Sequence, residues 1–129
     1  VSGWILSRGR NHGLPSYSDH LGIGGNSGNA GRLIFLHGAN PDAVVAGKTE
    51  IPRWTWQQVV FVRDGLKVRV YLDGKLEIET TAAANFPTGF DQLFLGGRCD
   101  NRSNWEGRLD EIAIYNRALN ASEIAKLAP

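Results

Sequence analysis

The sequence predicts an all-β domain built from many short strands. Its 129 residues are enough for one domain with a single core. The 16 glycines exceed the usual share of about 7%, which favours many tight turns. Short runs of apolar and β-branched residues alternate with clusters of Gly, Asn, Ser and Pro, and only the C-terminus has a helical pattern.

The first predicted strands are residues 4–8, 20–23 and 32–37, separated by loops rich in Gly and Asn. From Gln58 to Val62 the apolar residues are nearly continuous. That pattern is typical of a strand covered on both faces or placed at the centre of a sheet.

A hairpin follows this strand. We predict a three-residue loop, 72–74, with Gly74 in the left-handed conformation. A two-residue turn would set charged residues against apolar ones. The predicted register makes five pairs: Tyr71 with Lys75, Val70 with Leu76, Val68 with Ile78, Arg69 with Glu77, and Lys67 with Glu79.

The last predicted strand begins near Gly107 and runs to Tyr115. Its apolar pattern changes phase across Asp110 and Glu111, which predicts a β-bulge there. A short helix then follows. Asn120 is its expected N-cap, Glu123 has capping-box spacing, and Leu119 and Ile124 have the spacing of a hydrophobic staple.

Several of these features occur together in one known family. They are Trp54 and Trp56 before a Val-rich strand, the Tyr-Leu-Asp-Gly hairpin at 71–74, the Leu-Gly-Gly turn at 95–97, and Leu-Asp-Glu-Ile-Ala-Ile-Tyr-Asn-Arg-Ala-Leu at 109–119 before the helix. In this combination the chain resembles a laminin G-like, concanavalin A-like lectin/glucanase domain. The resemblance implies a two-sheet antiparallel β-sandwich, or jelly roll, with one short C-terminal helix.

The resemblance also bears on the ends of the chain. Family members usually carry one or two strands upstream of the Ile-Leu-Ser-Arg-Gly segment at 5–9. The chain has no Met and begins Val-Ser-Gly. We therefore expect one domain over 1–129, a processed chain or a fragment of a larger protein, in which the first strands are lost or the fold is rearranged. An open sheet edge would favour a homodimer through edge-strand pairing.

Composition excludes several classes of partner. A net charge of +1, with 14 basic and 13 acidic residues intermixed, gives no basic surface for nucleic acid. No apolar run approaches the roughly 20 residues of a membrane span. Cys99 is the single cysteine, so it forms no internal disulfide and founds no thiolate zinc site.

Aromatic residues flanked by polar ones are the candidate carbohydrate site. A sugar ring stacks on Trp or Tyr while amides and carboxylates bind its hydroxyls. Trp105 is the first candidate and Tyr17, beside Asp19 and His20, is the second; Asp100, Asn101 and Asn104 are the polar partners of Trp105. The alternatives are rim packing for Trp105 and ordinary turn chemistry for the polar loop.

The other three tryptophans have a plainer interpretation. Trp54 and Trp56 lead into an apolar strand, and Trp4 begins one, so we predict that all three pack in the core or at its edge.

The resemblance implies a calcium ion at the sandwich rim in many members. Calcium takes six to eight oxygen ligands, and one carboxylate with loop carbonyls can supply them. Asp110, at the irregular point of its strand, is the candidate metal ligand. The alternative is a structural carboxylate that accepts backbone amides at a bulge.

Nothing in the sequence has the pattern of a catalytic centre. Glu77 and Glu79 share a strand face, but the predicted register pairs both with basic residues, so they do not form the facing carboxylates of a glycosidase. The three histidines have no metal spacing, and no Gly-x-Ser-x-Gly turn is present. We expect no enzyme activity.

The predicted function is therefore a noncatalytic recognition module for carbohydrate, assisted by calcium. Two alternatives stay open: a protein-interaction or structural module without a sugar site, and a fragment of a glycan-cleaving enzyme. The resemblance implies an extracellular or cell-surface location, with a carbohydrate or an extracellular protein as partner.

Overall fold

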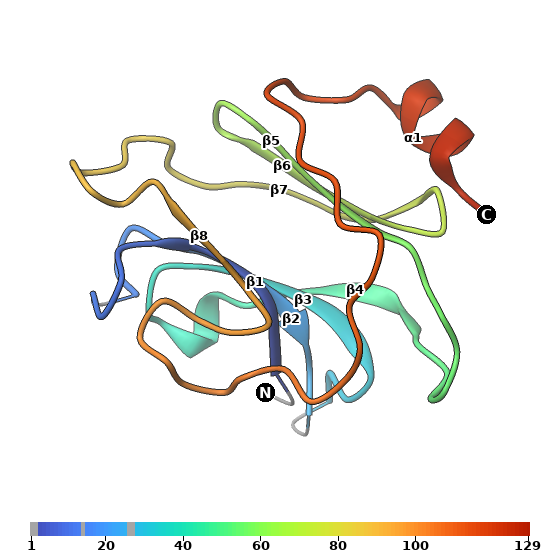
Figure 1. Ribbon diagram of the computed structural model, residues 1–129, viewed down its shortest axis with the longest axis horizontal. Helices are drawn as coiled ribbons and strands as arrows, with labels where there is room; N and C mark the ends of the chain where they lie inside the picture. The colour runs from blue at the N-terminus through green and yellow to red at the C-terminus, as the bar shows by residue number, and fades with distance from the viewer. Residues whose placement is uncertain (1–2, 14, 26–27) are drawn as a thin grey trace.

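Two antiparallel sheets form the body of the molecule (Figure 1). The computed structural model describes residues 3–13, 15–25 and 28–129. One sheet has the order β4-β3-β2-β1-β8 and the other the order β5-β6-β7. The strands are β1 (Gly3–Gly9), β2 (Asp19–Ile23), β3 (Arg32–His37), β4 (Val45–Glu50), β5 (Val59–Asp64), β6 (Lys67–Leu72), β7 (Lys75–Thr81) and β8 (Gln92–Leu95), with a 3-10 turn η1 (Pro41–Ala43) and a helix α1 (Ala121–Leu127).

The main core lies between the two sheets. Leu21, Leu33 and Phe35 face inward from the five-stranded sheet and meet Val68, Val70 and Ile78 of the three-stranded sheet. The rings of Phe35 and Phe61 stack across the interface at 5.9 Å. Because successive side chains of a strand point to opposite faces, these alternate residues form one apolar layer. The all-β sandwich with one short helix is confirmed.

A second apolar cluster covers the other face of the five-stranded sheet. Trp4, Ile34 and Leu36 are buried there. Residues 96–105 cross this face, joined to β1 by a bridge between Trp4 and Asn104. The prediction that Trp4 belongs to the core is confirmed, because only 1% of its surface is exposed.

The hairpin between β6 and β7 differs from the predicted one. Leu72 pairs with Lys75 and Tyr71 with Leu76, so the turn has two residues, Asp73 and Gly74. Both have positive φ, 47° and 77°, as the favoured two-residue hairpin turns require. The predicted three-residue loop was wrong.

A bulge at Glu77 sets an apolar residue opposite an apolar one and a charged residue opposite one of the other sign. The register shifts after Tyr71, so that Val70 faces Ile78 and Arg69 faces Glu79. Glu77 is the extra residue of a β-bulge. All the predicted pairs were therefore wrong: Tyr71 pairs with Leu76, Val70 with Ile78, Arg69 with Glu79, Val68 with Thr80 and Lys67 with Thr81. Glu77 is left unpaired in the hairpin and contacts the other sheet.

Glu77 closes one side of the sandwich. Its Oε2 accepts hydrogen bonds from the backbone amides of Lys48 (2.7 Å) and Thr49 (2.9 Å), and its Oε1 accepts one from the Thr49 hydroxyl (2.7 Å). These groups belong to β4, a strand that the sequence patterns did not predict. Gly47 leaves room for the carboxylate, since a Cβ there would lie 2.9 Å from Oε2.

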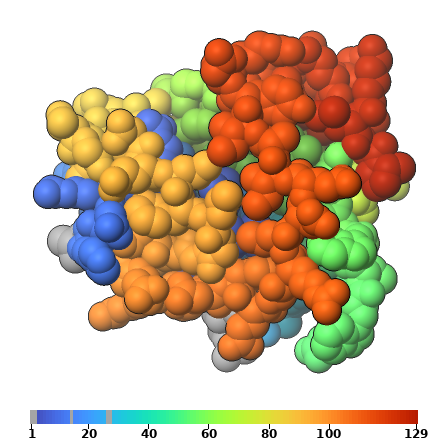
Figure 2. Space-filling model, in the orientation of Figure 1, coloured from blue at the N-terminus to red at the C-terminus, as the bar shows by residue number. Residues whose placement is uncertain are grey.

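The predicted last strand is not part of either sheet. Residues 109–115 pair with neither sheet in the described structure, and Glu111 has a φ of 50°. This segment crosses the face of the molecule turned toward the viewer in Figures 1 and 2. The prediction of a β-bulge within a strand ladder at Asp110 was therefore wrong. The irregular backbone that the change of phase indicated is present, but there is no partner strand.

The C-terminal helix matches the prediction. Asn120 is the N-cap, and its side chain accepts from the Glu123 amide at 2.9 Å while the Glu123 carboxylate accepts from the Asn120 amide at 2.9 Å. Leu119 and Ile124 are both buried against Val62 and Tyr71. The capping box and the staple together attach the helix to the outer face of the three-stranded sheet.

Candidate functional site

The loop that carries most of the predicted site residues is held firmly against β1. The amide of Trp4 donates to the carbonyl of Ser103 at 2.9 Å, and the amide of Trp105 donates to the carbonyl of Gly96 at 2.9 Å. Asn101 and Ser103 both have positive φ. Backbone bonds at both ends thus set the shape of residues 96–105.

Asp100 stabilises this loop through hydrogen bonds with two neighbouring residues of the same loop. Its carboxylate receives two hydrogen bonds from the Arg98 guanidinium, at 2.8 and 2.7 Å, and one from the Arg102 amide at 3.2 Å. Burial alone would raise the pKa of Asp100, but the bonds and charge of Arg98 outweigh it and lower the pKa below its ordinary value. The Asp100 carboxylate is therefore charged, and it is already hydrogen-bonded to Arg98 and to the Arg102 amide.

The remaining polar side chains of the loop face solvent. The Asn104 amide donates to Oδ1 of Asn101 at 3.2 Å, and both residues are exposed. Trp105 is half-buried beside them and lies close to Gly3 and Gly107. A Cβ at Gly107 would be 2.6 Å from Nε1 of the indole, so only glycine allows this close approach. Asn101, Asn104 and Trp105 thus share one preorganised loop.

Tyr17 does not join this group. Its ring is exposed and meets Phe90 edge-on at 6.1 Å. Phe90 precedes the end of β8 that pairs with Gly9, whereas Trp105 lies against Gly3. These are opposite ends of β1, and seven strand residues at about 3.3 Å each span about 20 Å. Tyr17 and Trp105 do not contact one sugar ring together.

Asp110 lies in the irregular segment after Trp105. Its Oδ1 accepts a hydrogen bond from the Glu111 amide at 2.8 Å. Residues 3–13, 15–25 and 28–129 contain no group of three or more His, Cys, Asp or Glu that could hold a metal. A calcium ion at Asp110 would take most of its ligands from carbonyls and water.

A large cleft opens between the sheets on the side opposite Glu77. Its volume is about 2300 Å³, and β5, residues 105–119 and the inner faces of β1 and β8 line it. Trp54 and Trp56 stand at this cleft, 100% and 66% exposed. The prediction that these two residues pack in the core was wrong, because no element of the described structure covers them.

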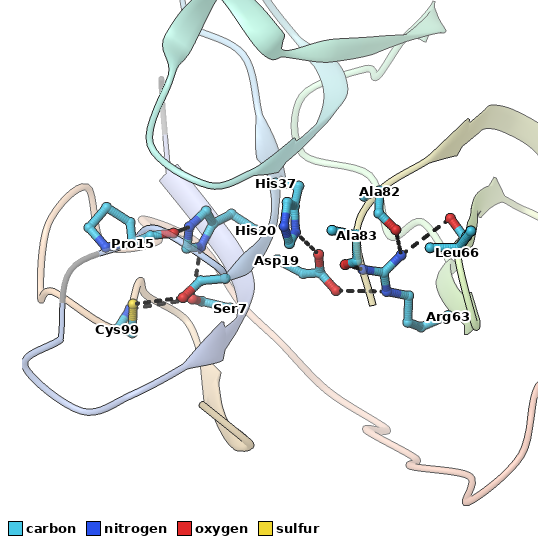
Figure 3. A network of polar contacts seen from close by, with 11 residues as sticks. Ser7, Pro15, Asp19, His20, His37, Arg63, Leu66, Ala82, Ala83 and Cys99 are labelled. Carbon is cyan, nitrogen blue, oxygen red and sulfur yellow. Dashed lines mark hydrogen bonds and ion pairs between the residues drawn. The ribbon is translucent and has the colours of Figure 1, made fainter. Parts of the chain in front are cut away.

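The sequence patterns also missed a buried polar network on the inner and outer faces of β2 (Figure 3). Ser7 Oγ lies 2.9 Å from Nδ1 of His20, and His20 Nε2 lies 3.4 Å from the carbonyl of Pro15. A carbonyl only accepts, so Nε2 carries the proton and Nδ1 accepts from the Ser7 hydroxyl. Burial, then the charge of Arg98, lowers the pKa of His20 to about 4.

The distance between Ser7 and His20 is that of a catalytic nucleophile and its base, but a substrate cannot reach the pair. Ser7 and His20 are both fully buried, so no substrate carbonyl reaches the Ser7 hydroxyl. Cys99 is buried beside them, and its amide donates to Ser7 Oγ at 3.3 Å. The three side chains hold the loop 96–105 on β1 and β2.

A second polar cluster joins the two sheets. His37 Nδ1 lies 2.8 Å from Oδ1 of Asp19, and Nε of Arg63 lies 3.1 Å from Oδ2. Asp19 belongs to β2 and Arg63 to β5, and the Arg63 guanidinium also donates to the carbonyls of Ala82 and Ala83. In Figure 3 Asp19 lies between His37 and Arg63. Every charge here is paired, as a buried structural site requires.

Comparison with known proteins supplies the family. A model described as the concanavalin A-like lectin/glucanases superfamily matches residues 3–125. The chain belongs to this superfamily. The resemblance noted in the sequence is thereby confirmed. A search of curated proteins finds no match.

One solved structure similar to this superfamily member is an S-layer domain-containing protein from Clostridium thermocellum, residues 221–444. The sequence identity is 18% and the TM-score 0.53. The alignment covers 100% of this chain and 64% of the solved one, so the chain spans less than two thirds of that structure. At this identity the likeness concerns the fold. No helix in the described residues is long and apolar enough to cross a membrane.

Proposed function

We propose that this domain is a noncatalytic carbohydrate-recognition module of an extracellular or cell-surface protein. The description of the superfamily names lectins beside glucanases, which supports a recognition module, and the likeness to an S-layer domain-containing protein supports the location. One observation carries the choice of ligand: the half-buried indole of Trp105 lies on the same rigid loop as the exposed amides of Asn101 and Asn104.

The loop suits a sugar because its shape is set before binding. The indole would stack on the apolar face of a pyranose ring, and the amides would donate to and accept from its hydroxyls. Asp100 is bound to Arg98, so it would stabilise the loop rather than form a hydrogen bond with a sugar hydroxyl. A preorganised loop loses little conformational entropy when a ligand binds.

The noncatalytic part of the proposal rests on the carboxylates and the serine. Glu77 is bound to β4, Glu79 faces Arg69 across the hairpin, and Ser7 is fully buried. None of them is paired with a second group across an open site, as glycoside hydrolysis requires.

A glycan array tests the ligand class. Binding is expected to fall by about tenfold or more in Trp105→Ala, the loss of one stacked aromatic ring, and to stay unchanged in Tyr17→Ala. Tyr17 is the matched control because it is an exposed aromatic at the other end of β1. Equal losses in both variants, or no binding to any glycan, would reject the Trp105 site.

We include calcium at Asp110 in the proposal as an assisting ion. Binding and thermal melting are measured with calcium and again with a chelator, on the original chain and on Asp110→Asn. A calcium-dependent rise in Tm that Asp110→Asn loses supports the ion. The same Tm for both proteins, with calcium and with chelator, would reject the calcium ion. The Trp105 site would then be judged by the glycan array alone.

A further inference from the structure

His20 is linked by hydrogen bonds to the loop that carries the proposed ligand site. The Ser7 hydroxyl donates to Nδ1 of His20 at 2.9 Å and accepts from the Cys99 amide at 3.3 Å. Cys99 lies in the middle of the loop 96–105, and dashed lines in Figure 3 follow this chain of contacts. One buried side chain of β2 is therefore connected through Ser7 to the backbone of the loop.

The loop 96–105 lies on the face of the five-stranded sheet that is turned away from the main core. None of its residues belongs to that core in the part of the chain that the structure describes. Besides the bond to Ser7, single backbone hydrogen bonds attach the loop to its surroundings, from Gly96 to Ile5, from Trp4 to Ser103 and from His12 to Cys99. A segment with so few attachments can open locally while the sheets stay folded.

In its neutral form His20 has a partner on each ring nitrogen. Nδ1 accepts from the Ser7 hydroxyl, and Nε2 donates to the carbonyl of Pro15 at 3.4 Å. The residue is fully buried, and its ring lies 5.4 Å from that of Trp4. The structure therefore provides for one ring proton, on Nε2.

A second proton, on Nδ1, would disturb this arrangement. Nδ1 would become a donor, and the Ser7 hydroxyl would lose its acceptor. Of the charged and titratable groups near the ring, Arg98 and His37 oppose a positive charge, and Asp100 favours it but is already paired with Arg98. Burial, followed by the charge of Arg98, lowers the pKa of His20 to about 4. The imidazolium is therefore unfavourable in the arrangement that the structure shows.

We propose that the loop 96–105 opens when His20 takes up a second proton, so that acid releases the ligand from the Trp105 site. Opening of the loop lets water solvate the charged ring, and it breaks the bond between Cys99 and Ser7. The loop then loses the shape that a ligand needs, whereas the main core, on the other face of the sheet, stays folded. The release of a ligand rests on the proposed function; the opening of the loop does not.

Amide hydrogen exchange of the whole chain, without any glycan, tests the opening. Exchange is measured at pH 7.5 and pH 4.5 and corrected for the intrinsic effect of pH on each amide. We expect the corrected exchange of residues 96–105 to accelerate by about tenfold or more at pH 4.5, because the open loop binds the proton more tightly than the closed one. At both pH values the loop amides should stay less protected than residues 68–70 and 76–78 of the core strands.

Histidine variants check that His20 is the group that takes up the proton. His20→Gln keeps a polar side chain but has no ring proton to gain, and we expect it to lose most of the acceleration at pH 4.5. His12→Asn is the matched control, because His12 is exposed, its bond to Cys99 comes from the backbone, and Asn tolerates its positive φ. It should behave as the original chain does. If His20→Gln does not fold, NMR titration of the original chain replaces it, and the His20 ring and the loop amides should change with one midpoint.

Ligand release is measured separately, on the glycan array at pH 7.5 and at pH 4.5. Binding by the original chain should fall by about tenfold or more at the lower pH and return when the pH is raised again, and binding by His20→Gln should change little. A chain that binds no glycan at pH 7.5 would reject the proposed function, and with it the release of a glycan. The exchange experiment contains no glycan and would still decide whether the loop opens.

Three results would overturn the opening of the loop. Unchanged exchange of residues 96–105 at pH 4.5 would mean that the loop does not respond to acid. Equal protection of the loop and of the core strands at both pH values would mean that the domain opens only by unfolding as a whole. An acceleration of the same size in His20→Gln, or separate midpoints for the ring and the loop amides, would mean that another group takes up the proton.

Discussion

Glu77 shows how one side chain can redirect a hairpin. In the bulged register of β6 and β7, Val70 faces Ile78, and the Glu77 carboxylate accepts hydrogen bonds from the backbone amides of Lys48 and Thr49 in β4. Burial alone would raise the pKa of Glu77, but the Thr49 and Lys48 hydrogen bonds and the Lys48 charge outweigh it and lower the pKa. The carboxylate is therefore charged at neutral pH.

Replacing Glu77 should lower stability because two backbone amides lose a charged acceptor. We expect Glu77→Gln to lower the free energy of unfolding by about 1 to 2 kcal/mol, measured by urea denaturation. Glu79→Gln, on an exposed residue of the same strand, should change it little. Equal effects of the two substitutions would show that the bonds to β4 contribute nothing.

His20 should make stability depend on pH. Its pKa is lowered from 6.5 to about 4 in the folded chain, so the unfolded chain binds the extra proton first as pH falls. The contribution is fully present above pH 6.5 and is lost toward pH 4. We expect the original chain to lose about 2 kcal/mol more than His20→Gln between pH 7.5 and pH 4.5, measured by urea unfolding. Parallel pH profiles would contradict this.

At the scale of elements, the C-terminal helix was predictable because every signal for it is local. Capping box, staple and apolar spacing all lie within Leu119 to Leu127. The segment 109–115 has an equally strong strand pattern, yet it forms no ladder. A strand needs a partner strand to satisfy its backbone, and local sequence does not supply one.

The helix cap gives an element-scale prediction. Asn120→Ala removes the side chain that accepts from the Glu123 amide, and should cost about 1 kcal/mol of stability. Ser122→Ala, at an exposed position inside the same helix, should cost nothing because Ala is the better helix former. Chemical denaturation of both variants measures the difference, and an equal loss in both would argue against the cap.

At the scale of the whole molecule, the two sheets are held together by the core and by a few polar links at its margins. The Asp19–Arg63 pair is one of them, with side chains only 2% and 13% exposed. Removing one partner would leave a buried charge unpaired, which is more costly than losing the pair itself.

We therefore expect Asp19→Ala to destabilise the chain by about 3 kcal/mol. Asp64→Ala is the control: Asp64 is 60% exposed and lies 3.6 Å from Arg69, and a surface pair of this kind contributes about 0 to 1 kcal/mol. Urea denaturation compares the two. If Asp19→Ala cost no more than Asp64→Ala, the link between the sheets would not be a structural one.

The sequence by itself determined the fold class, the family and the C-terminal helix of this protein. These depend on alternation, turn residues and capping residues that lie close together along the chain, such as Asn120 with Glu123. The same local signals placed Trp4 in the core, and they indicated the irregular backbone at Asp110.

Only the tertiary structure decided what depends on contacts between distant segments. It placed Glu77 on β4, buried the Ser7–His20 pair, separated Tyr17 from Trp105, and left Trp54 and Trp56 exposed at an open cleft. The physical reason is that burial and strand pairing belong to two partners at once. The pattern of one strand shows which face needs covering, and the arrangement of the other segments decides whether anything covers it.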